Sequence, residues 1–265
     1  MNYKHYVIIR FYCNDMLDKN ILFSNDLLMP AINIFKNYTL KSLENQTNTN
    51  FEIILAIHND IDIKNEAIIS LYNIDSSIKI NIMKLRDIQQ FIINNTKNCE
   101  YLITTRLDHD DLIQNNANEA VIQSLYNNAN IPVFTHAFTS GGTIINNDFN
   151  NVYEFNPTYN GKGCIGLFYS LIIKKDIISK LKIQNILELG NHTLIYDKLK
   201  ELCINANILY KNIENSEYCS WLYVKHDFNH STYINENLNK NWHRSNNKIN
   251  NSLEYFYERF GKINI

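Results

Sequence analysis

The chain has 265 residues, a formal net charge of −2 at pH 7 and a hydrophobic fraction of 45%. This composition is ample for a folded core and excludes a largely disordered chain. The near-neutral charge argues against a nucleic-acid-binding protein, which would need a basic face. Roughly one residue in six is Asn, so a single Asn carries little functional weight.

The five cysteines, at positions 13, 99, 164, 203 and 219, are odd in number and none lies in a C-x-x-C pair. This pattern disfavours a disulfide framework or a zinc knuckle and favours a reducing compartment. The N-terminus is too short and polar for a signal peptide, and no apolar run is long enough to span a bilayer. We therefore expect a soluble, cytoplasmic protein without a transmembrane segment, whose only membrane contact would be peripheral.

Strands and helices are predicted to alternate through the first half of the chain. The predicted strands are residues 6–12, 51–57, 78–83, 101–107 and 131–136, and the predicted helices are 27–46, 65–72, 87–95 and 115–126. Such alternation predicts an α/β fold with a mainly parallel sheet and right-handed crossovers.

The pattern changes after residue 138. Four of the seven glycines fall between positions 141 and 163, in a polar, turn-rich stretch. A strand is then predicted at 167–173, a helix at 191–202 with Asn191 as its N-cap, and an amphipathic helix at 252–260. With no repeat and no linker composition, residues 1–265 are expected to form a single domain.

An acidic cluster follows the apolar run that begins at Tyr101. Asp108, Asp110 and Asp111 are close enough to repel one another strongly unless a positive charge lies between them. A hard divalent cation, Mg²⁺ or Mn²⁺, is the usual remedy, because it prefers oxygen ligands. In an extended segment Asp108 and Asp110 would point to one side and His109 to the other. The alternative is a strand followed by a solvated acidic turn or a helix N-terminus.

Three sequence elements, in this order, resemble the bacterial putative rhamnosyltransferase family. They are F-K-N-Y-T-L-K-S-L-E-N-Q-T-N-T-N-F-E at 35–52, T-T-R-L-D-H-D-D at 104–111 and W-L-Y-V-K-H-D-F-N at 221–229. The family is similar to metal-dependent glycosyltransferases of the GT-A fold that use nucleotide sugars. It often has a glycine after the histidine of the third element, where this chain has Asp227. The resemblance implies a GT-A domain in which residues 1–138 bind the nucleotide sugar and 139–265 form the acceptor side and a C-terminal tail or lid.

The implied reaction moves a sugar, rhamnose by family name, from a nucleoside diphosphate sugar to a glycan or other hydroxyl acceptor. The resemblance makes Asp110 the principal metal ligand, with Asp108 contacting the metal through water or the nucleotide ribose. Asp111 supports them. His226 would bring the C-terminal segment over the metal, although a lone histidine is more often packed or solvated.

Further residues are candidates for contacting the nucleotide. Arg10 ends the first strand and could meet base or phosphate, although a surface arginine is an equal alternative. Arg106 could face the nucleotide, brace the carboxylates or pair structurally with Asp111. Asn229 could donate to the phosphates.

An inverting reaction would need a general base to take the acceptor proton, whereas a retaining one would not. The candidates are Glu188, before a glycine turn, and His192, at a predicted helix start that would keep it neutral. For both, a structural role is the competing interpretation. Two other enzyme classes compete with the glycosyltransferase. They are a metal-dependent phosphohydrolase, suggested by the His109–Asp110 dipeptide, and a metal-dependent nucleotidyltransferase.

Overall fold

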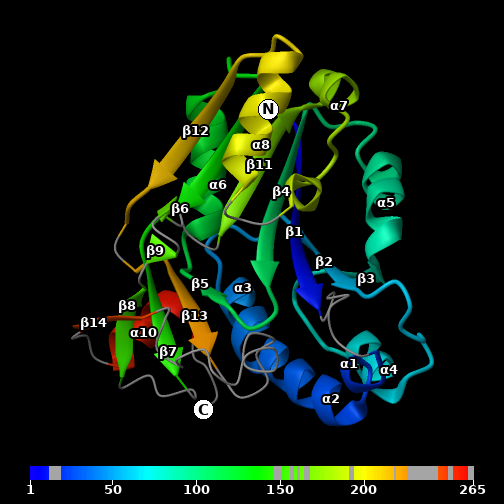
Figure 1. Cartoon of the computed structure of the whole chain (residues 1–265), viewed down its shortest axis with the longest axis vertical. Coiled ribbons are helices and arrows are strands. Elements are labelled where there is room, and N and C mark those ends of the chain that lie inside the picture. The colour runs from blue at the N-terminus through cyan, green and yellow to red at the C-terminus, as the bar shows by residue number, and fades with distance from the viewer. Residues whose placement is uncertain are drawn as a thin grey trace.

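The computed structural model describes residues 1–11, 19–145, 151–155, 158–159, 162–163, 168–190, 194–217, 219–225, 244–249 and 253–261. Its centre is a seven-stranded sheet of order β12-β6-β11-β4-β1-β2-β3 (Figure 1). In chain order these strands are β1 (Tyr3–Phe11), β2 (Glu52–Ile57), β3 (Ile80–Lys84), β4 (Tyr101–Asp108), β6 (Val133–Phe138), β11 (Tyr169–Lys174) and β12 (Tyr210–Asn215).

This sheet is mainly parallel, as predicted. β1 pairs in parallel with β2 and β4, β2 with β3, and β6 with β12, whereas β11 runs antiparallel between β4 and β6. The chain proceeds from β1 to β2 and β3 on one side and then places β4 on the other side of β1. The strand order reverses between β1 and β4, and open α/β sheets bind ligands at the carboxyl ends of the strands at such a switch point.

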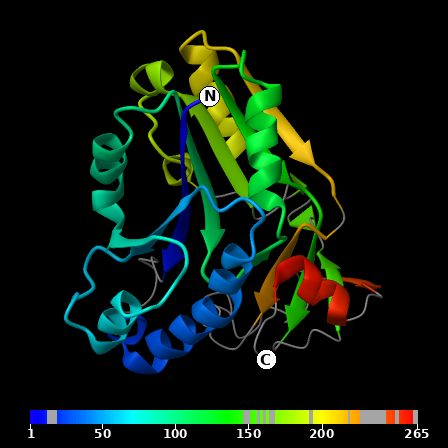
Figure 2. The same ribbon diagram turned by 180° about the vertical axis from the view of Figure 1, so that it is seen from behind.

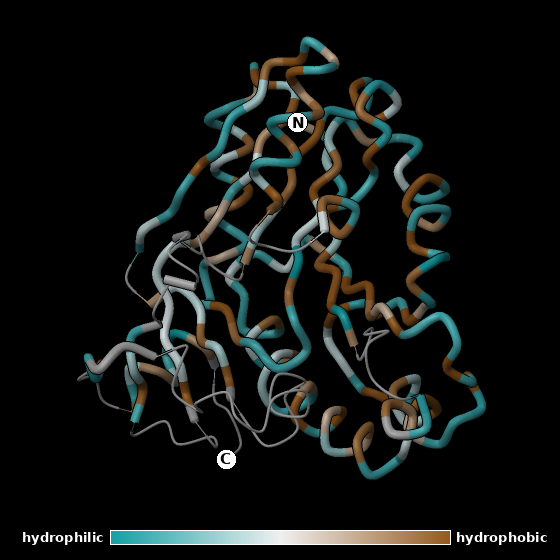
Figure 3. Tube along the Cα trace, viewed as in Figure 1, coloured by the Kyte–Doolittle hydropathy of each residue, from teal (hydrophilic) through white to brown (hydrophobic). Residues whose placement is uncertain are grey.

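Helices cover both faces of the sheet, because its buried strands are apolar on both sides. One face packs against α2 (Asn25–Ile34), α3 (Leu40–Glu44), α4 (Glu66–Tyr72) and α6 (Ala117–Asn127), the last of which lies over the sheet in Figure 2. The opposite face packs against α5 (Ile88–Asn95), α7 (Lys175–Leu181), the 3₁₀ turn η3 (Ile186–Leu189) and α8 (Ile195–Asn205). The apolar colouring of the central strands in Figure 3 follows this arrangement.

Most of the predicted elements are present, with shifted ends. The predicted helix 27–46 consists of α2, a π-helical turn η1 (Phe35–Thr39) and α3, preceded by the short α1 (Lys19–Leu22). The helix predicted to begin at Asn191 is α8, and it begins four residues later. Its buried stripe of Ile195, Leu199 and Cys203 starts only there, whereas Asn191 lies outside the described residues.

A second sheet, of order β14-β8-β7-β13-β5, was not predicted. It contains β5 (Leu112–Ile113), β7 (Gly141–Ile145), β8 (Val152–Phe155), β13 (Trp221–Lys225) and β14 (Arg244–Lys248), and α10 (Leu253–Phe260) packs against it. A two-stranded ladder of β9 (Thr158–Tyr159) and β10 (Lys162–Gly163) is separate. Gly141 lies so close beneath Trp221 that a Cβ there would be 2.2 Å from the indole ring, which explains one glycine of the turn-rich stretch.

No helix within the described ranges is long and apolar enough to cross a membrane.

The buried His5 predicts an acid-dependent loss of stability. Its Nε2 lies 2.8 Å from Thr105 Oγ1, and burial lowers the pKa of His5 to about 3. The unfolded chain, with a histidine pKa near 6.5, therefore takes up a proton that the folded chain refuses between about pH 6.5 and 3. This histidine thus makes stability fall as pH falls, by up to about 1.4 kcal/mol per pH unit.

The measurement is urea unfolding of the wild type and His5→Gln between pH 4 and 7. The difference in slope isolates one proton, because other buried groups contribute to both proteins equally. Parallel curves would contradict a neutral buried His5.

Candidate functional site at the carboxyl ends of β1 and β4

An arginine–carboxylate pair lies at the switch point of the sheet. The parallel register places Arg10 opposite Asp108, so both side chains leave their strands on the same face. Arg10 Nε and Nη2 donate to Asp108 Oδ1 at 3.0 and 2.9 Å, and Nη2 also donates to Oδ2 at 3.1 Å. Both side chains are about one-third exposed. The pair is therefore accessible to a ligand at the carboxyl ends of these two strands.

Arg106 lies on the same face of β4 but is buried. Its Nη1 donates to the carbonyl of Gly190 at 2.9 Å, and its Nε lies 4.0 Å from Asp108 Oδ1. Burial lowers the pKa of the guanidinium, while Asp108 opposes that shift. Two residues earlier, Thr104 Oγ1 accepts a 2.9 Å hydrogen bond from the backbone N–H of Ile186. Thr104 and Arg106 therefore attach η3 and the following residue, Gly190, to β4.

The acidic cluster does not continue the strand. β4 ends at Asp108, and His109 and Asp110 form a turn, so the predicted alternation of His109 against the two carboxylates is wrong. A turn lacks the two-residue periodicity on which that prediction depended, and His109 Nδ1 lies 4.0 Å from Asp110 Oδ1. Thr39 Oγ1 holds the turn by donating to the His109 carbonyl at 2.6 Å. Asp110 is buried.

Asp111 is the most deeply buried of the three carboxylates, with an exposed fraction of 3%. It accepts a hydrogen bond from the backbone N–H of Val224 in β13. Within the described residues its Oδ1 has no hydrogen-bond partner. Burial raises the pKa of Asp111 well above its usual value, and the charges of Asp110 and Asp108 raise it further. Arg10 and Arg106 place positive charge beside Asp108, and the charge of Arg106 opposes the pKa shift of Asp111.

Of the two candidate general bases, Glu188 lies within the described residues and His192 does not. Glu188 is exposed as a residue, but its carboxylate accepts hydrogen bonds from Asn185 Nδ2 at 2.6 Å and from the Gln184 backbone N–H at 3.3 Å. Partial desolvation raises the pKa of Glu188. The carboxylate thus closes its own turn. His192 lies outside the described residues, as do the predicted metal ligand His226 and the predicted phosphate contact Asn229.

The oxygen donors of the acidic turn suit a hard divalent cation, and the unpartnered Oδ1 of Asp111 is the type of atom that a cation would satisfy. However, no group of three His, Cys, Asp or Glu side chains within the described part of the chain is arranged to hold a metal ion. A cation here would need additional oxygen ligands, such as those of a diphosphate.

Sequence reasoning missed two residues that shape this site. Thr39, in η1, donates a hydrogen bond to the acidic turn, and the Gly190 carbonyl accepts one from Arg106. Thr39 lies inside the first element that resembles the family, which is the only sequence signal that could have indicated it.

Together these features define an α/β protein whose polar site lies at the carboxyl edge of a mainly parallel sheet. Residues 16–119, which include β2 to β5 and the acidic cluster, match the family model described as "Putative rhamnosyl transferase". This match contains the first two of the three elements that carry the predicted resemblance, at 35–52 and 104–111, and confirms it there, whereas the third element, at 221–229, lies outside the match. The family name is that of the expected enzyme class, a glycosyltransferase. No curated protein matches the chain.

Several solved structures are similar to the chain at low identity. The UDP complex of S. aureus TarS 1-349 is 14% identical, with a TM-score of 0.44, and the match covers 84% of this chain and 61% of that one. A cytidylyltransferase from Leptospira borgpetersenii is 18% identical, with a TM-score of 0.40 and coverages of 82% and 79%. A putative glucose-1-phosphate thymidylyltransferase from Bacillus anthracis is 11% identical, with a TM-score of 0.43 and coverages of 89% and 94%.

Proposed function

We propose that this chain is a glycosyltransferase that takes a sugar from a nucleoside diphosphate sugar with the help of Mn²⁺ or Mg²⁺. The observation that carries the proposal is the position of Arg10, Asp108 and Asp110 at the carboxyl ends of β1 and β4. Asp108 and Asp110 also lie in the segment that matches the family. A ligand bound at this switch point of the sheet would lie beside these side chains.

The chemistry of sugar transfer requires positive charge at the donor diphosphate. Negative charge accumulates on the diphosphate as the anomeric carbon–oxygen bond breaks, and stabilising that charge lowers the barrier. A bound divalent cation would supply a Lewis acid at this point. Asp110 and Asp108 are the side chains proposed to hold it, with Asp111 supporting them from its buried position.

Arginines and C-terminal residues complete the proposed donor site. Arg10 is exposed enough to donate to a phosphate or a ribose hydroxyl while it holds Asp108. Arg106, whose Nη1 donates to Gly190, would contribute positive charge from its buried position near Asp108. His226 and Asn229 are proposed to approach the cation and the phosphates.

The acceptor is proposed to be a glycan or another hydroxyl compound, and rhamnose is the donor sugar that the family name suggests. If the reaction inverts the anomeric centre, Glu188 or His192 would take the acceptor proton. We further propose that residues 1–265 act as one catalytic domain in the cytoplasm, with residues 1–138 on the donor side and 139–265 on the acceptor side.

Nucleotide binding is expected to depend on the cation, and the cation on the nucleotide. Two or three carboxylate ligands leave the coordination shell incomplete until phosphate oxygens fill it. Calorimetry with UDP, GDP and dTDP should show binding of at least one diphosphate in Mn²⁺ and a loss of roughly tenfold or more with excess chelator. The nucleoside of the bound diphosphate serves as a matched control, because it lacks phosphate oxygens and should be insensitive to chelator.

Equal affinity for the diphosphate with and without cation would contradict the metal-assisted mechanism. Product analysis then separates the enzyme classes. A glycosyltransferase supplied with its nucleotide sugar and water releases a nucleoside diphosphate, whereas a nucleotidyltransferase supplied with a nucleoside triphosphate and a sugar phosphate releases pyrophosphate.

A further inference from the structure

The chain immediately after the acidic turn is fixed by a fully buried glutamine. Gln114 follows β5, three residues after Asp111, and its side chain is fully buried. Its backbone N–H donates to Ser220 at 3.0 Å, and its carbonyl accepts from Gln46 Nε2 at 2.8 Å. The main chain at this point is therefore held from both the N-terminal and the C-terminal parts of the protein.

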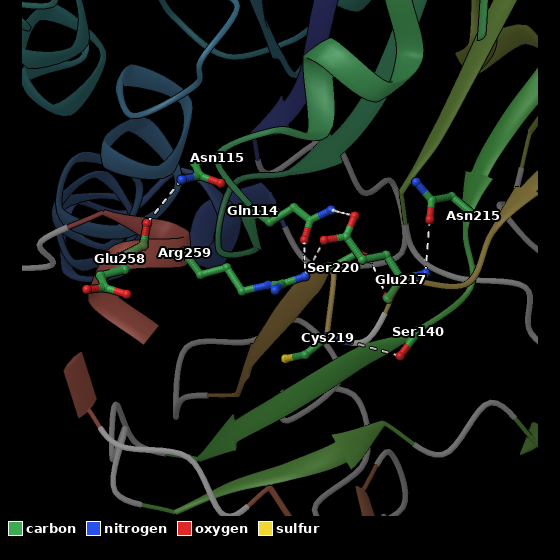
Figure 4. Close-up of polar contacts among 9 residues, drawn as sticks. All are labelled: Gln114, Asn115, Ser140, Asn215, Glu217, Cys219, Ser220, Glu258 and Arg259. Carbon is green, nitrogen blue, oxygen red and sulfur yellow. Dashed lines mark hydrogen bonds and ion pairs between the residues drawn. The ribbon is translucent and has the colours of Figure 1, made fainter. Parts of the chain in front are cut away.

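The Gln114 side chain is held by an ion pair that reaches it from α10. Gln114 Nε2 donates to Glu217 Oε2 at 2.9 Å, and Gln114 Oε1 accepts from Arg259 Nη2. The same Nη2 donates to Glu217 Oε1 at 2.8 Å. Figure 4 shows the three side chains meeting, with Arg259 extending from the last helix. The three contacts form a closed triangle in which each side chain orients the other two.

The next residue attaches the end of α10 to the same place. The Asn115 backbone N–H donates to the Arg259 carbonyl at 2.7 Å. Asn115 Nδ2 donates to the Glu258 carbonyl at 3.1 Å, as Figure 4 shows. These carbonyls belong to the last turn of α10, where no partner exists inside the helix. The end of α10 and the loop after β5 therefore satisfy each other's backbone groups and are held together as one unit.

The acidic turn is tied to this unit on both sides. β5 pairs with β13, Leu112 opposite Leu222, and the Val224 N–H of β13 donates to Asp111. Glu217 lies in the segment that leads into β13. A change at the Arg259 contact would therefore reach the carboxylates through two routes of only a few residues each.

We propose that Arg259 is a positioning residue of the donor site, which holds the acidic turn in place through Gln114 and Glu217. The proposal rests on the function proposed above, because it assigns the turn a ligand. Arg259 and Glu217 are partly exposed, at 21% and 38%, so their ion pair by itself contributes little to global stability. Loss of Arg259 would also leave the buried Gln114 Oε1 without this donor. The main consequence of losing the contact is expected to be a less ordered acidic turn.

The test compares Arg259→Met with Lys4→Met as a matched control. Lys4 forms an ion pair with Glu52. It lies near the amino end of β1, whereas the proposed site lies at the carboxyl end of that strand. Arg259→Met should speed amide hydrogen exchange at residues 111–114 and weaken Mn²⁺-dependent binding of the diphosphate about tenfold, the scale for loss of a supporting contact. Lys4→Met should change neither, and Arg259→Lys should recover part of both.

Two outcomes overturn the positioning role. One is unchanged exchange at residues 111–114 in a folded Arg259→Met protein, and the other is faster exchange with unchanged diphosphate affinity. Glu217→Gln provides the same two measurements if Arg259→Met does not fold, because it removes the charge but keeps the size of the side chain. Failure of the proposed function looks different, since the wild type itself would then bind no diphosphate.

Discussion

Replacing Asp110 by asparagine is expected to lower sugar transfer by roughly 10³-fold, which corresponds to about 4 kcal/mol of transition-state stabilisation. Asp110 is buried at the tip of the turn that follows β4, and its role in the proposed site is to hold the cation against the leaving diphosphate. An amide is a much poorer ligand for a hard cation than a carboxylate. Folding should be retained, because the amide keeps the size of the side chain and the change removes repulsion with Asp111.

The control for this experiment lies one residue away. Asp111→Asn keeps an oxygen that can accept the Val224 N–H. If Asp111 is only structural, this variant should keep its stability and its activity. If Asp111 binds the metal, the variant should lose activity. Initial rates and thermal unfolding of both variants separate these roles. Near-normal turnover of Asp110→Asn would show that another residue is the principal ligand.

The central fold could be predicted because its inner strands are buried on both faces and read as apolar runs. Val7 and Ile9 face one helical layer and Tyr6 and Ile8 the other, so the local sequence already indicates a covered parallel sheet. The second sheet could not be predicted in this way. β13 pairs with β5 and β7, and these partners are short and far away in sequence.

The site was predicted only in part, for a similar reason. Three carboxylates in four residues are visible in any sequence, and they suggested that a cation must lie between them. The sequence does not indicate the strand register that pairs Arg10 with Asp108, nor the hydrogen bond from Arg106 to Gly190. The chain therefore supplies much of the opposing charge itself, and the demand for a cation is weaker than sequence spacing implied. What a cation would add is contact with the diphosphate.

Arg106→Met is expected to lower the free energy of unfolding by about 3 kcal/mol, because breaking a buried charged contact leaves its partners unsatisfied. Arg106 is 3% exposed. Its loss leaves the Gly190 carbonyl without this donor and removes a positive charge near Asp108. Arg10→Met removes the other arginine from the same carboxylate, but from an exposed position. It should therefore cost at most about 1 kcal/mol of stability while weakening diphosphate binding.

Urea unfolding followed by tryptophan fluorescence measures the first effect, and calorimetry measures the second. The two variants should give opposite patterns, with Arg106 acting mainly on folding and Arg10 mainly on the ligand. If Arg106→Met proved as stable as Arg10→Met, the contact with Gly190 would contribute no more to folding than an exposed ion pair does. Arg106 would then be available to the nucleotide, which is the other role that its place in the T-T-R-L-D-H-D-D element allows.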